Sequence, residues 1–299
     1  MEQTGELRSA RFARFYELAR SSTWALDRTL ATIAFPPSSH VLVPQRLAAV
    51  EEYLDKRLEV AAHSDRTGNG LLVRGRSNIG RIAAALNTSF ETIAGAANAG
   101  ADLLLVHHAP WAEIDLQLHE RKLAAARDVG LSLYAAHEAL DRAPDESVGG
   151  SLARQLDLLL EHAGNGNLAV GHAPNIPFHA WLQLIATRLA TPVKAWQNNP
   201  TFRRVAVVPG GGGSTSYLAE ASTRGCDTFL TGEGSLYTEL FAHETGLSLV
   251  YATHAATEFP SICEFARSVA AALALEVICI PEARWITGGG RAPIEYGWS

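Results

Sequence analysis

Two adjacent histidines, His107 and His108, are the residues of this chain whose type and placement most clearly suggest chemistry. They end the apolar run of ADLLLVHHAPWAE, residues 101–113, a pattern typical of a strand that is buried on both faces and ends near Pro110. Because successive strand side chains point to opposite faces, the two imidazoles can converge only where the strand ends. Open α/β sheets bind ligands at that edge, and neutral imidazole is the commonest metal ligand. A metal or catalytic site is one interpretation, and a core histidine beside a solvent-facing one is the other.

A histidine followed four residues later by a carboxylate occurs twice, as His137 with Asp141 and as His254 with Glu258. With the histidine pair they form a nitrogen and oxygen donor set without thiolates, which suits a divalent ion of the Zn, Mn, Fe or Ni class. A single catalytic zinc ion needs fewer ligands than this set provides. Two ions about 3.5–4 Å apart, bridged by a carboxylate and a water, would use them all. We therefore expect two divalent ions per chain, with Asp141 or Glu258 as the bridge and hydrolysis as the natural chemistry.

Each of these residues also has a structural interpretation. Asp141 could cap a turn, and Glu258 could be a carboxylate in the first turn of a helix. His137 could orient a metal ligand without binding the metal itself. Glu233 in TGEGS is either a carboxylate near the substrate or a turn residue. The other histidines occupy loops or helix faces, where we expect them to be solvated or packed: His40, His63, His119, His162, His172, His179 and His243.

Two parts of the chain repeat the same pattern. RIAAALNTSFETIAGAANAGADLLLVHH (81–108) and RVAVVPGGGGSTSYLAEASTRGCDTFLTGE (204–233) both predict a strand, a loop, a helix, a glycine, one residue, an aspartate and a strand. The helix that follows each copy leads to GLSLYAAHEALD (130–141) in the first and GLSLVYATHAATE (246–258) in the second. The repeat predicts two similar α/β units.

Helical spacing outside the repeat predicts the elements that frame it. The expected helices are Phe15–Ala34, one from Pro44 in QRLAAVEEYLDKRLEVAA, Gln117–Val129, SLARQLDLLLEHA (151–163), FHAWLQLIATRLATP (178–192) and Ile262–Leu273. Gly210–Gly213, between a strand and a helix, could cradle a phosphate through backbone N–H groups. The stretch lacks the rest of a dinucleotide-binding fingerprint. An NAD-dependent enzyme that uses these glycines is therefore a weaker hypothesis, and it would require that the purified protein retains the cofactor.

Composition excludes several classes of protein. A net charge of −6 argues against a general nucleic-acid binder or a binder of anionic membranes, because both need clustered Lys and Arg. No apolar run approaches the roughly 18 residues of a membrane span, and the N-terminus lacks the apolar core of a signal peptide. Cys226, Cys263 and Cys279 show no CxxC spacing and are expected to be buried thiols in a reducing compartment. We therefore expect a cytoplasmic location.

Five motifs occur in a fixed order: HSDRTGNGLLV (63–73), VHHAPW (106–111), AAHEALD (135–141), TGEGS (231–235) and ATHAATE (252–258). Together they resemble the GTP cyclohydrolase I type 2 family, also called the Nif-three-like dinuclear-metal hexameric proteins. The resemblance covers residues 44–281 and implies two similar α/β domains with a dinuclear metal site between them. It also implies a ring-shaped homohexamer, a trimer of dimers. The implied division is an N-terminal extension (1–43), a first domain (44–149, completed by 255–299) and a second domain (150–254).

The resemblance also implies a ligand set. Position by position, the metal ligands of the family fall on His107, His108, Asp141, His254 and Glu258. His137 lies beside them and, with Glu233, is a candidate for a catalytic role around a metal-bound water.

This sequence departs from the family pattern around the last motif. Thr253 replaces a usual glycine, Ala255 replaces a frequent His or Tyr, and Pro260 breaks the usual start of the last helix. Ala255 leaves a position for proton transfer empty. The expected function is a metal-dependent hydrolase of the GTP cyclohydrolase I type 2 kind that acts on a nucleotide-like or cyclic amide substrate. The alternative is a non-catalytic metal-binding ring that serves as a scaffold or binds a partner.

Overall fold

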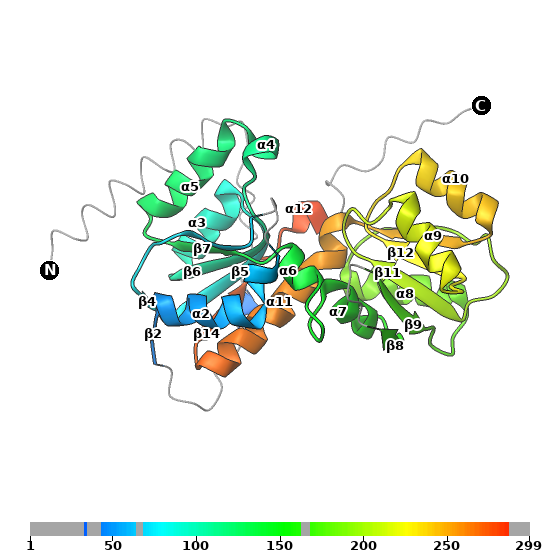
Figure 1. Cartoon of the computed structure of the whole chain (residues 1–299), viewed down its shortest axis with the longest axis horizontal. Coiled ribbons are helices and arrows are strands. Elements are labelled where there is room, and N and C mark those ends of the chain that lie inside the picture. The colour runs from blue at the N-terminus through cyan, green and yellow to red at the C-terminus, as the bar shows by residue number, and fades with distance from the viewer. Residues whose placement is uncertain (1–32, 35–42, 64–67, 163–167, 287–299) are drawn as a thin grey trace, which may run out of the picture. The chain divides into compact units, whose positions relative to one another are not determined.

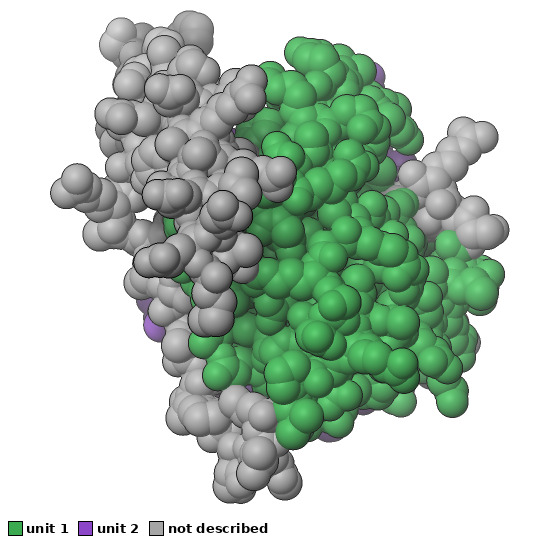
Figure 2. Space-filling view, turned by 90° about the vertical axis from the view of Figure 1, so that its left-hand side faces the viewer, with its two compact units in different colours: residues 1–146, 261–281 green, residues 147–260, 282–299 purple. Residues whose placement is uncertain are grey.

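The computed structural model divides the chain into two compact units. Unit 1 comprises residues 1–146 and 261–281, and unit 2 comprises residues 147–260 and 282–299 (Figures 1 and 2). The structure describes residues 33–34, 43–63, 68–162 and 168–286. Most of the expected N-terminal extension, His40, part of the HSDRTGNGLLV motif, the side chain of His162 and residues 287–299 lie outside the described residues. The domain limits implied by the family stay a prediction.

Unit 1 is built on a six-stranded sheet with the order β1-β14-β5-β6-β7-β3. Its strands are β1 (Ile33–Ala34), β14 (Glu276–Cys279), β5 (Arg81–Asn87), β6 (Leu103–His108), β7 (Ser132–Ala135) and β3 (Gly70–Val73). The four inner strands are parallel, and both edge strands are antiparallel to them. The central strand β6 is buried along Leu103–His107, which explains its continuous apolar run.

Helices cover both faces of this sheet. Helices α3 (Phe90–Asn98) and α5 (Leu118–Asp128) pack on one face through Ile93 and Leu123. On the other face lies α2 (Leu47–Arg57), where the Tyr134 hydroxyl donates to Asp55 at 2.8 Å (Figure 1). The remaining elements of the unit are short: β2 (Gln45–Arg46), β4 (Asn78–Ile79), a 3-10 turn (Val60–Ala62), α4 (Ala112–Asp115) and α6 (Glu138–Asp141).

Unit 2 has a six-stranded sheet with the order β10-β13-β12-β11-β9-β8. Its strands are β10 (Val193–Trp196), β13 (Ser248–Ala252), β12 (Thr228–Thr231), β11 (Arg204–Val208), β9 (Ala169–His172) and β8 (Leu159–His162). One face packs against α7 (Val148–Gln155) and α8 (Phe178–Leu189), and the other against α9 (Thr215–Thr223) and α10 (Leu236–Thr245). Helix α11 (His254–Leu273) contains the boundary between the units, and α12 (Ala283–Ile286) belongs to unit 2.

The predicted internal repeat is confirmed, since β3-β7-β6-β5 and β10-β13-β12-β11 have the same order and directions. The aspartate before β6 or β12 ties that strand to the start of the strand beside it. Asp102 Oδ2 accepts from the N–H of Gly80 at 2.9 Å and of Arg81 at 3.2 Å. Asp227 Oδ2 accepts from the N–H of Arg203 at 2.9 Å and of Arg204 at 3.3 Å. In both copies of the repeat, the aspartate of the shared glycine-x-aspartate signature therefore joins two neighbouring strands through hydrogen bonds to backbone N–H groups.

The helix predicted over 151–163 is wrong beyond Gln155. Asp157 has a positive φ of 60°, which reverses the chain, and Leu158 N–H bonds back to the carbonyl of Ala153. Residues Leu159–His162 then form the edge strand β8, antiparallel to β9. A short apolar run has no periodicity that separates a buried helix from a strand, so only the neighbouring strand decides. Strands β9 and β10 were not predicted.

Two further elements differ from the sequence-based expectation. Ile33 and Ala34, predicted to end a helix, pair with β14 as β1. The last helix begins at His254 instead of Ile262 and continues through Pro260. Pro260 is the seventh residue of this helix, so the helix continues through it without the N–H that would bond to the carbonyl of Ala256. The early start matters because it places His254 and Glu258 on one helix.

Candidate functional site

Three histidine rings of unit 1 lie together, and we refer to them as the histidine cluster. The ring centres of His107 and His137 are 4.8 Å apart, those of His107 and His108 are 5.0 Å apart, and those of His108 and His137 are 5.6 Å apart. One ring nitrogen from each residue lies within 4.8 Å of the others. His107 and His108 end β6, and His137 follows the neighbouring strand β7, so the sheet edge assembles the cluster.

Hydrogen bonds fix the orientation of two of these rings. His107 is 1% exposed, and its Nδ1 lies 2.8 Å from the carbonyl oxygen of Ala136. A carbonyl only accepts, so this nitrogen carries the proton and Nε2 is the atom that can bind a cation. His108 Nδ1 lies 2.7 Å from Asn87 Oδ1, which selects Nε2 in the same way. Such outer contacts typically orient metal-binding imidazoles.

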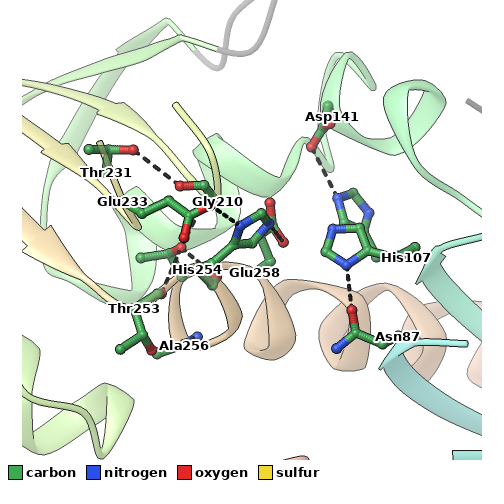
Figure 3. Close-up of polar contacts among 12 residues, drawn as sticks. Asn87, His107, Asp141, Gly210, Thr231, Glu233, Thr253, His254, Ala256 and Glu258 are labelled. Atoms are coloured by element: carbon green, nitrogen blue, oxygen red, sulfur yellow. Dashed lines mark hydrogen bonds and ion pairs between the residues drawn. The ribbon is translucent and has the colours of Figure 1, made fainter. Parts of the chain in front are cut away.

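Asp141 adds a carboxylate to the histidine cluster. Its Oδ1 lies 3.7 Å from His107 Nε2, and Figure 3 shows the carboxylate directed at the ring. The spacing of four residues corresponds to one helical turn, because Asp141 N–H donates to the carbonyl of His137 at 3.0 Å. Asn69 holds the start of this turn by accepting the His137 N–H at 2.8 Å. Unit 1 thus gathers three imidazoles and one carboxylate.

In unit 2, one imidazole lies between two carboxylates. His254 Nδ1 is 3.0 Å from Glu233 Oε1, and Nε2 is 3.0 Å from Glu258 Oε2 (Figure 3). Burial lowers the pKa of His254, but hydrogen bonds and charge from Glu258 and Glu233 outweigh it and raise the pKa to about 9. The two carboxylates that stabilise this proton would also stabilise a metal cation, which has to displace the proton from the ring nitrogen that it binds.

Gly210 allows the two ligand candidates of unit 2 to approach the backbone. Its φ is +60°, and a Cβ there would lie 1.8 Å from Glu258 Oε1 and 2.8 Å from His254 Nε2. Its N–H donates to Thr257 Oγ1 at 2.9 Å, and its carbonyl accepts from Glu233 N–H at 3.0 Å. This single residue therefore connects the glycine loop, the Glu233 turn and the start of α11.

Close packing also explains two other glycines of the loop. A Cβ on Gly212 would lie 2.3 Å from Val208, and one on Gly213 would lie 2.4 Å from Gly234 Cα. Gly213 forms an isolated parallel bridge with Gly234. Gly210, Gly212 and Gly213 therefore have a structural cause that requires no phosphate.

The repeat relates the two sets of residues to each other. His137 corresponds to His254, and Asp141 to Glu258, at the same places after β7 and β13. His108 corresponds to Glu233, so unit 2 carries a carboxylate where unit 1 carries an imidazole. Asn87 was not predicted as a site residue, although the parallel register of β5 and β6 pairs it directly with His108.

Other titratable residues have structural roles. His119 Nδ1 lies 2.6 Å from the carbonyl oxygen of Pro110, and His172 Nε2 lies 2.9 Å from Glu161 Oε1. Neither belongs to the histidine cluster. The three cysteines, all within the described residues, are buried thiols as expected. None of the helices in the described part of the chain is long and apolar enough to cross a membrane.

The sequence and the fold are similar to those of known proteins. The family model described as Duf34/NIF3 (NGG1p interacting factor 3) matches residues 45–284. A Deinococcus radiodurans protein named GTP cyclohydrolase 1 type 2 homolog is 34% identical over 216 residues, which cover 69% of this chain and 81% of that protein. A Pyrococcus horikoshii protein with the same name is 31% identical and covers 70% of this chain and 87% of its own length.

Solved structures share the fold. The structure titled "Structural genomics, protein ybgI, unknown function" has a TM-score of 0.72 and 26% identity, covering 80% of this chain and 99% of that chain. The structure titled "Reduced HcgD from Methanocaldococcus jannaschii" has a TM-score of 0.69 at 23% identity, covering 80% of this chain and 99% of that chain.

Proposed function

Because the chain belongs to the Duf34/NIF3 family, we propose that it holds a dinuclear divalent-metal centre and acts as a metal-dependent hydrolase. The proposed ligands are His107, His108, Asp141, His254 and Glu258. The observation that carries the proposal is the pair of oriented imidazoles at the end of β6, each with Nδ1 held by an oxygen acceptor so that Nε2 can bind an ion. The relatives named GTP cyclohydrolase 1 type 2 homolog support a hydrolytic reaction.

Ligand number and charge support two ions. Five nitrogen and oxygen ligands exceed the three protein ligands of a typical catalytic zinc site. Two carboxylates among them would supply negative charge to offset that of two dications. We propose that these residues hold ions of the Zn, Mn, Fe or Ni class. When bound, such a pair lowers the pKa of a shared water and polarises a carbonyl or phosphoryl oxygen.

The residues around the ligands have separate tasks in this proposal. Ala136 and Asn87 hold His107 and His108 in their ligating orientation. Glu233 accepts the Nδ1 proton of His254, which keeps Nε2 of that ring available as a ligand. Buried Ala255 has no group that could carry a proton, so His137 and Glu233 remain the candidates for proton transfer in hydrolysis of a nucleotide-like or cyclic amide substrate.

A second candidate function is a metal-binding scaffold without turnover. The family resemblance supports a homohexameric ring, a trimer of dimers, and the sequence composition is the basis for proposing a cytoplasmic location. The loss of a proton carrier at Ala255 favours this alternative. The two functions share the metal centre and differ only in turnover.

Metal analysis combined with activity tests the proposal. The full-length protein, loaded with Mn or Zn, should bind about two ions per chain and hydrolyse at least one member of a panel of nucleotides, including GTP, and cyclic amides. His107→Ala should lose metal and activity, whereas His172→Ala, whose ring lies outside the histidine cluster, should keep both. Less than one ion per chain, unaffected by His107→Ala, would refute the metal centre. Full occupancy without any turnover would support the scaffold.

A further inference from the structure

Asn69 lies beside the turn that follows β7. Gly70, the first residue of β3, pairs with Ala135, the last residue of β7, and the two strands are antiparallel. Asn69 therefore lies level with the backbone that leaves β7. Its Oδ1 accepts the N–H of His137 at 2.8 Å and the N–H of Ala139 at 3.3 Å. One side-chain oxygen thus binds two backbone N–H groups just after the strand ends.

The turn that Asn69 contacts is too short to be stable by itself. Helix α6 consists of four residues, and its N-cap residue, His137, makes no capping hydrogen bond with its own side chain. Fixing a single turn gains too few hydrogen bonds to offset the chain entropy that is lost. The N–H groups at the start of a helix also need acceptors from outside the helix. Asn69 supplies this acceptor from a position 68 residues earlier in the chain, and the turn that it holds ends in Asp141.

The same hydrogen bond also acts on His107. The carbonyl of Ala136 and the N–H of His137 belong to one peptide unit, which is planar. Asn69 accepts from the N–H of this unit at 2.8 Å, and His107 Nδ1 donates to its carbonyl at 2.8 Å. A rotation of the peptide would break both hydrogen bonds. The acceptor on one side of the peptide therefore helps to hold the imidazole on the other side.

The backbone around Asn69 depends on two glycines. Gly68 has a φ of +74° and Gly70 a φ of +98°, values that residues with a side chain rarely adopt. A Cβ on Gly68 would also lie 2.9 Å from that of Ala109, so this loop packs closely on the segment after β6. Asn69 itself does not have a positive φ. Its backbone therefore gives no reason for an asparagine, whereas the hydrogen bonds of its side-chain oxygen do.

The second copy of the repeat has a different arrangement at this position. The register of β10 with β13 places Pro192 where unit 1 has Asn69, and a proline side chain has no acceptor. The start of the corresponding helix is capped by Thr253, whose Oγ1 accepts the N–H of Ala256 at 3.4 Å. That helix, α11, also continues for 20 residues. A cap from the segment before the neighbouring strand is therefore a feature of the short turn in unit 1.

From these contacts we propose that Asn69 is a positioning residue for the metal centre. Its side-chain oxygen fixes the peptide between residues 136 and 137, and thereby the ligating orientation of His107 and the turn that carries Asp141. This inference rests on the proposed function, because His107 and Asp141 are proposed ligands. Loss of the oxygen would loosen two ligands at once, although neither residue is replaced.

Two variants with nearly the shape of the native side chain test this inference in the full-length protein. Asn69→Leu removes the acceptor, whereas Asn69→Asp keeps an oxygen in its place. In the metal-free protein, hydrogen–deuterium exchange should be faster over residues 136–141 in Asn69→Leu and unchanged in Asn69→Asp, as followed by mass spectrometry. In competition with a chelator, Asn69→Leu should bind Zn about 10–100-fold more weakly than the wild type. Asn69→Asp should bind it at least as tightly as the wild type, because its oxygen accepts the same N–H groups.

Asn199→Leu is the matched control. In unit 2, Asn199 Oδ1 accepts the N–H of Thr201 at 3.0 Å, and Nδ2 donates to the carbonyl of Gly246 at 3.0 Å. The same substitution there removes hydrogen bonds of the same kind that do not involve the proposed ligands. Asn199→Leu should therefore keep the metal affinity of the wild type and its exchange over residues 136–141.

The outcomes separate the inference from the proposed function. Wild-type metal affinity in Asn69→Leu, or equally weak binding by both Asn69 variants, would overturn the inference even if the protein hydrolyses a substrate. Exchange in Asn69→Leu that rises no more over residues 136–141 than over the rest of unit 1 would show a general loss of stability and also overturn it. Metal binding that depends on the Asn69 oxygen, in a protein that hydrolyses nothing, would refute the hydrolase and support the inference.

Discussion

Replacement of Gly210 by alanine should disrupt the proposed ligand pair of unit 2, His254 and Glu258, without replacing either residue. The new Cβ would lie 1.8 Å from Glu258 Oε1, and protein Cβ atoms do not approach other atoms more closely than 3.0 Å. Glu258 must therefore retreat by about 1.2 Å, the difference of these distances. Metal–ligand distances hold only within about 0.2 Å, so Glu258 cannot stay a ligand in its present position.

Gly210→Ala carries a second penalty in the backbone. Its φ of +60° costs an alanine roughly 1–2 kcal/mol. We expect a loss of this order in the free energy of unfolding, together with a fall of about 10–100-fold in the affinity for one of the two proposed ions. The measurements are urea unfolding of the metal-free protein and competition of the loaded protein with a chelator of known affinity.

Gly211→Ala is the matched control for this experiment. The atoms nearest to its Cβ would be Glu233 Oε1 and His254 Cε1, both at 3.9 Å, and its backbone does not have a positive φ. Gly211→Ala should therefore keep the stability and the metal affinity of the wild type. If Gly210→Ala also keeps both ions with unchanged affinity, Glu258 is not a ligand and the proposed centre is wrong in unit 2.

Three further predictions concern other contacts of the structure. Asn87→Ala should lower metal affinity about 10–100-fold, measured by chelator competition, because His108 loses the acceptor that orients it. Burial raises the pKa of Asp102, but hydrogen bonds and charge from Arg76 and two backbone N–H groups outweigh it and lower the pKa. Asp102→Asn should therefore cost about 1–3 kcal/mol in urea unfolding near pH 7. This cost should begin to shrink below about pH 4, where the carboxylate of the unfolded chain becomes protonated, and should be lost only once the pH is also below the lowered pKa of the folded carboxylate. Burial raises the pKa of the Cys226 thiol to about 11, so native Cys226 should be alkylated about 100-fold more slowly at pH 8 than in the unfolded chain, by mass spectrometry of its peptide.

Each of these predictions has an outcome that contradicts it. Wild-type metal affinity in Asn87→Ala would mean that His108 needs no fixed orientation. A cost of Asp102→Asn that stays constant between pH 7 and pH 3 would mean that the carboxylate charge contributes nothing. Rapid alkylation of native Cys226 would show that the thiol is reached by solvent through local opening of unit 2.

Local sequence predicted most of the framework. The apolar run ending in His107 and His108 predicted a buried strand, and the glycine-x-aspartate signature predicted the repeat together with the shared Gly-Leu-Ser-Leu and the matched His-to-carboxylate spacing. Both signals are short-range, because they depend on periodicity and on backbone preferences within one supersecondary unit. The same signals failed over 151–163, where the helix stops at Gln155 and the pairing of β8 with β9 decides the rest.

The tertiary structure decided which side chains meet. The sequence by itself supplied the ligand candidates and the one-turn spacing of His137 and Asp141. Only the parallel register of β5 and β6 sets Asn87 beside His108, and only the fold of unit 2 brings Gly210 against Glu258. Those contacts join residues 21 and 48 positions apart, counted from 87 to 108 and from 210 to 258. Periodicity reports which way a side chain faces, whereas strand pairing and helix packing determine what it faces.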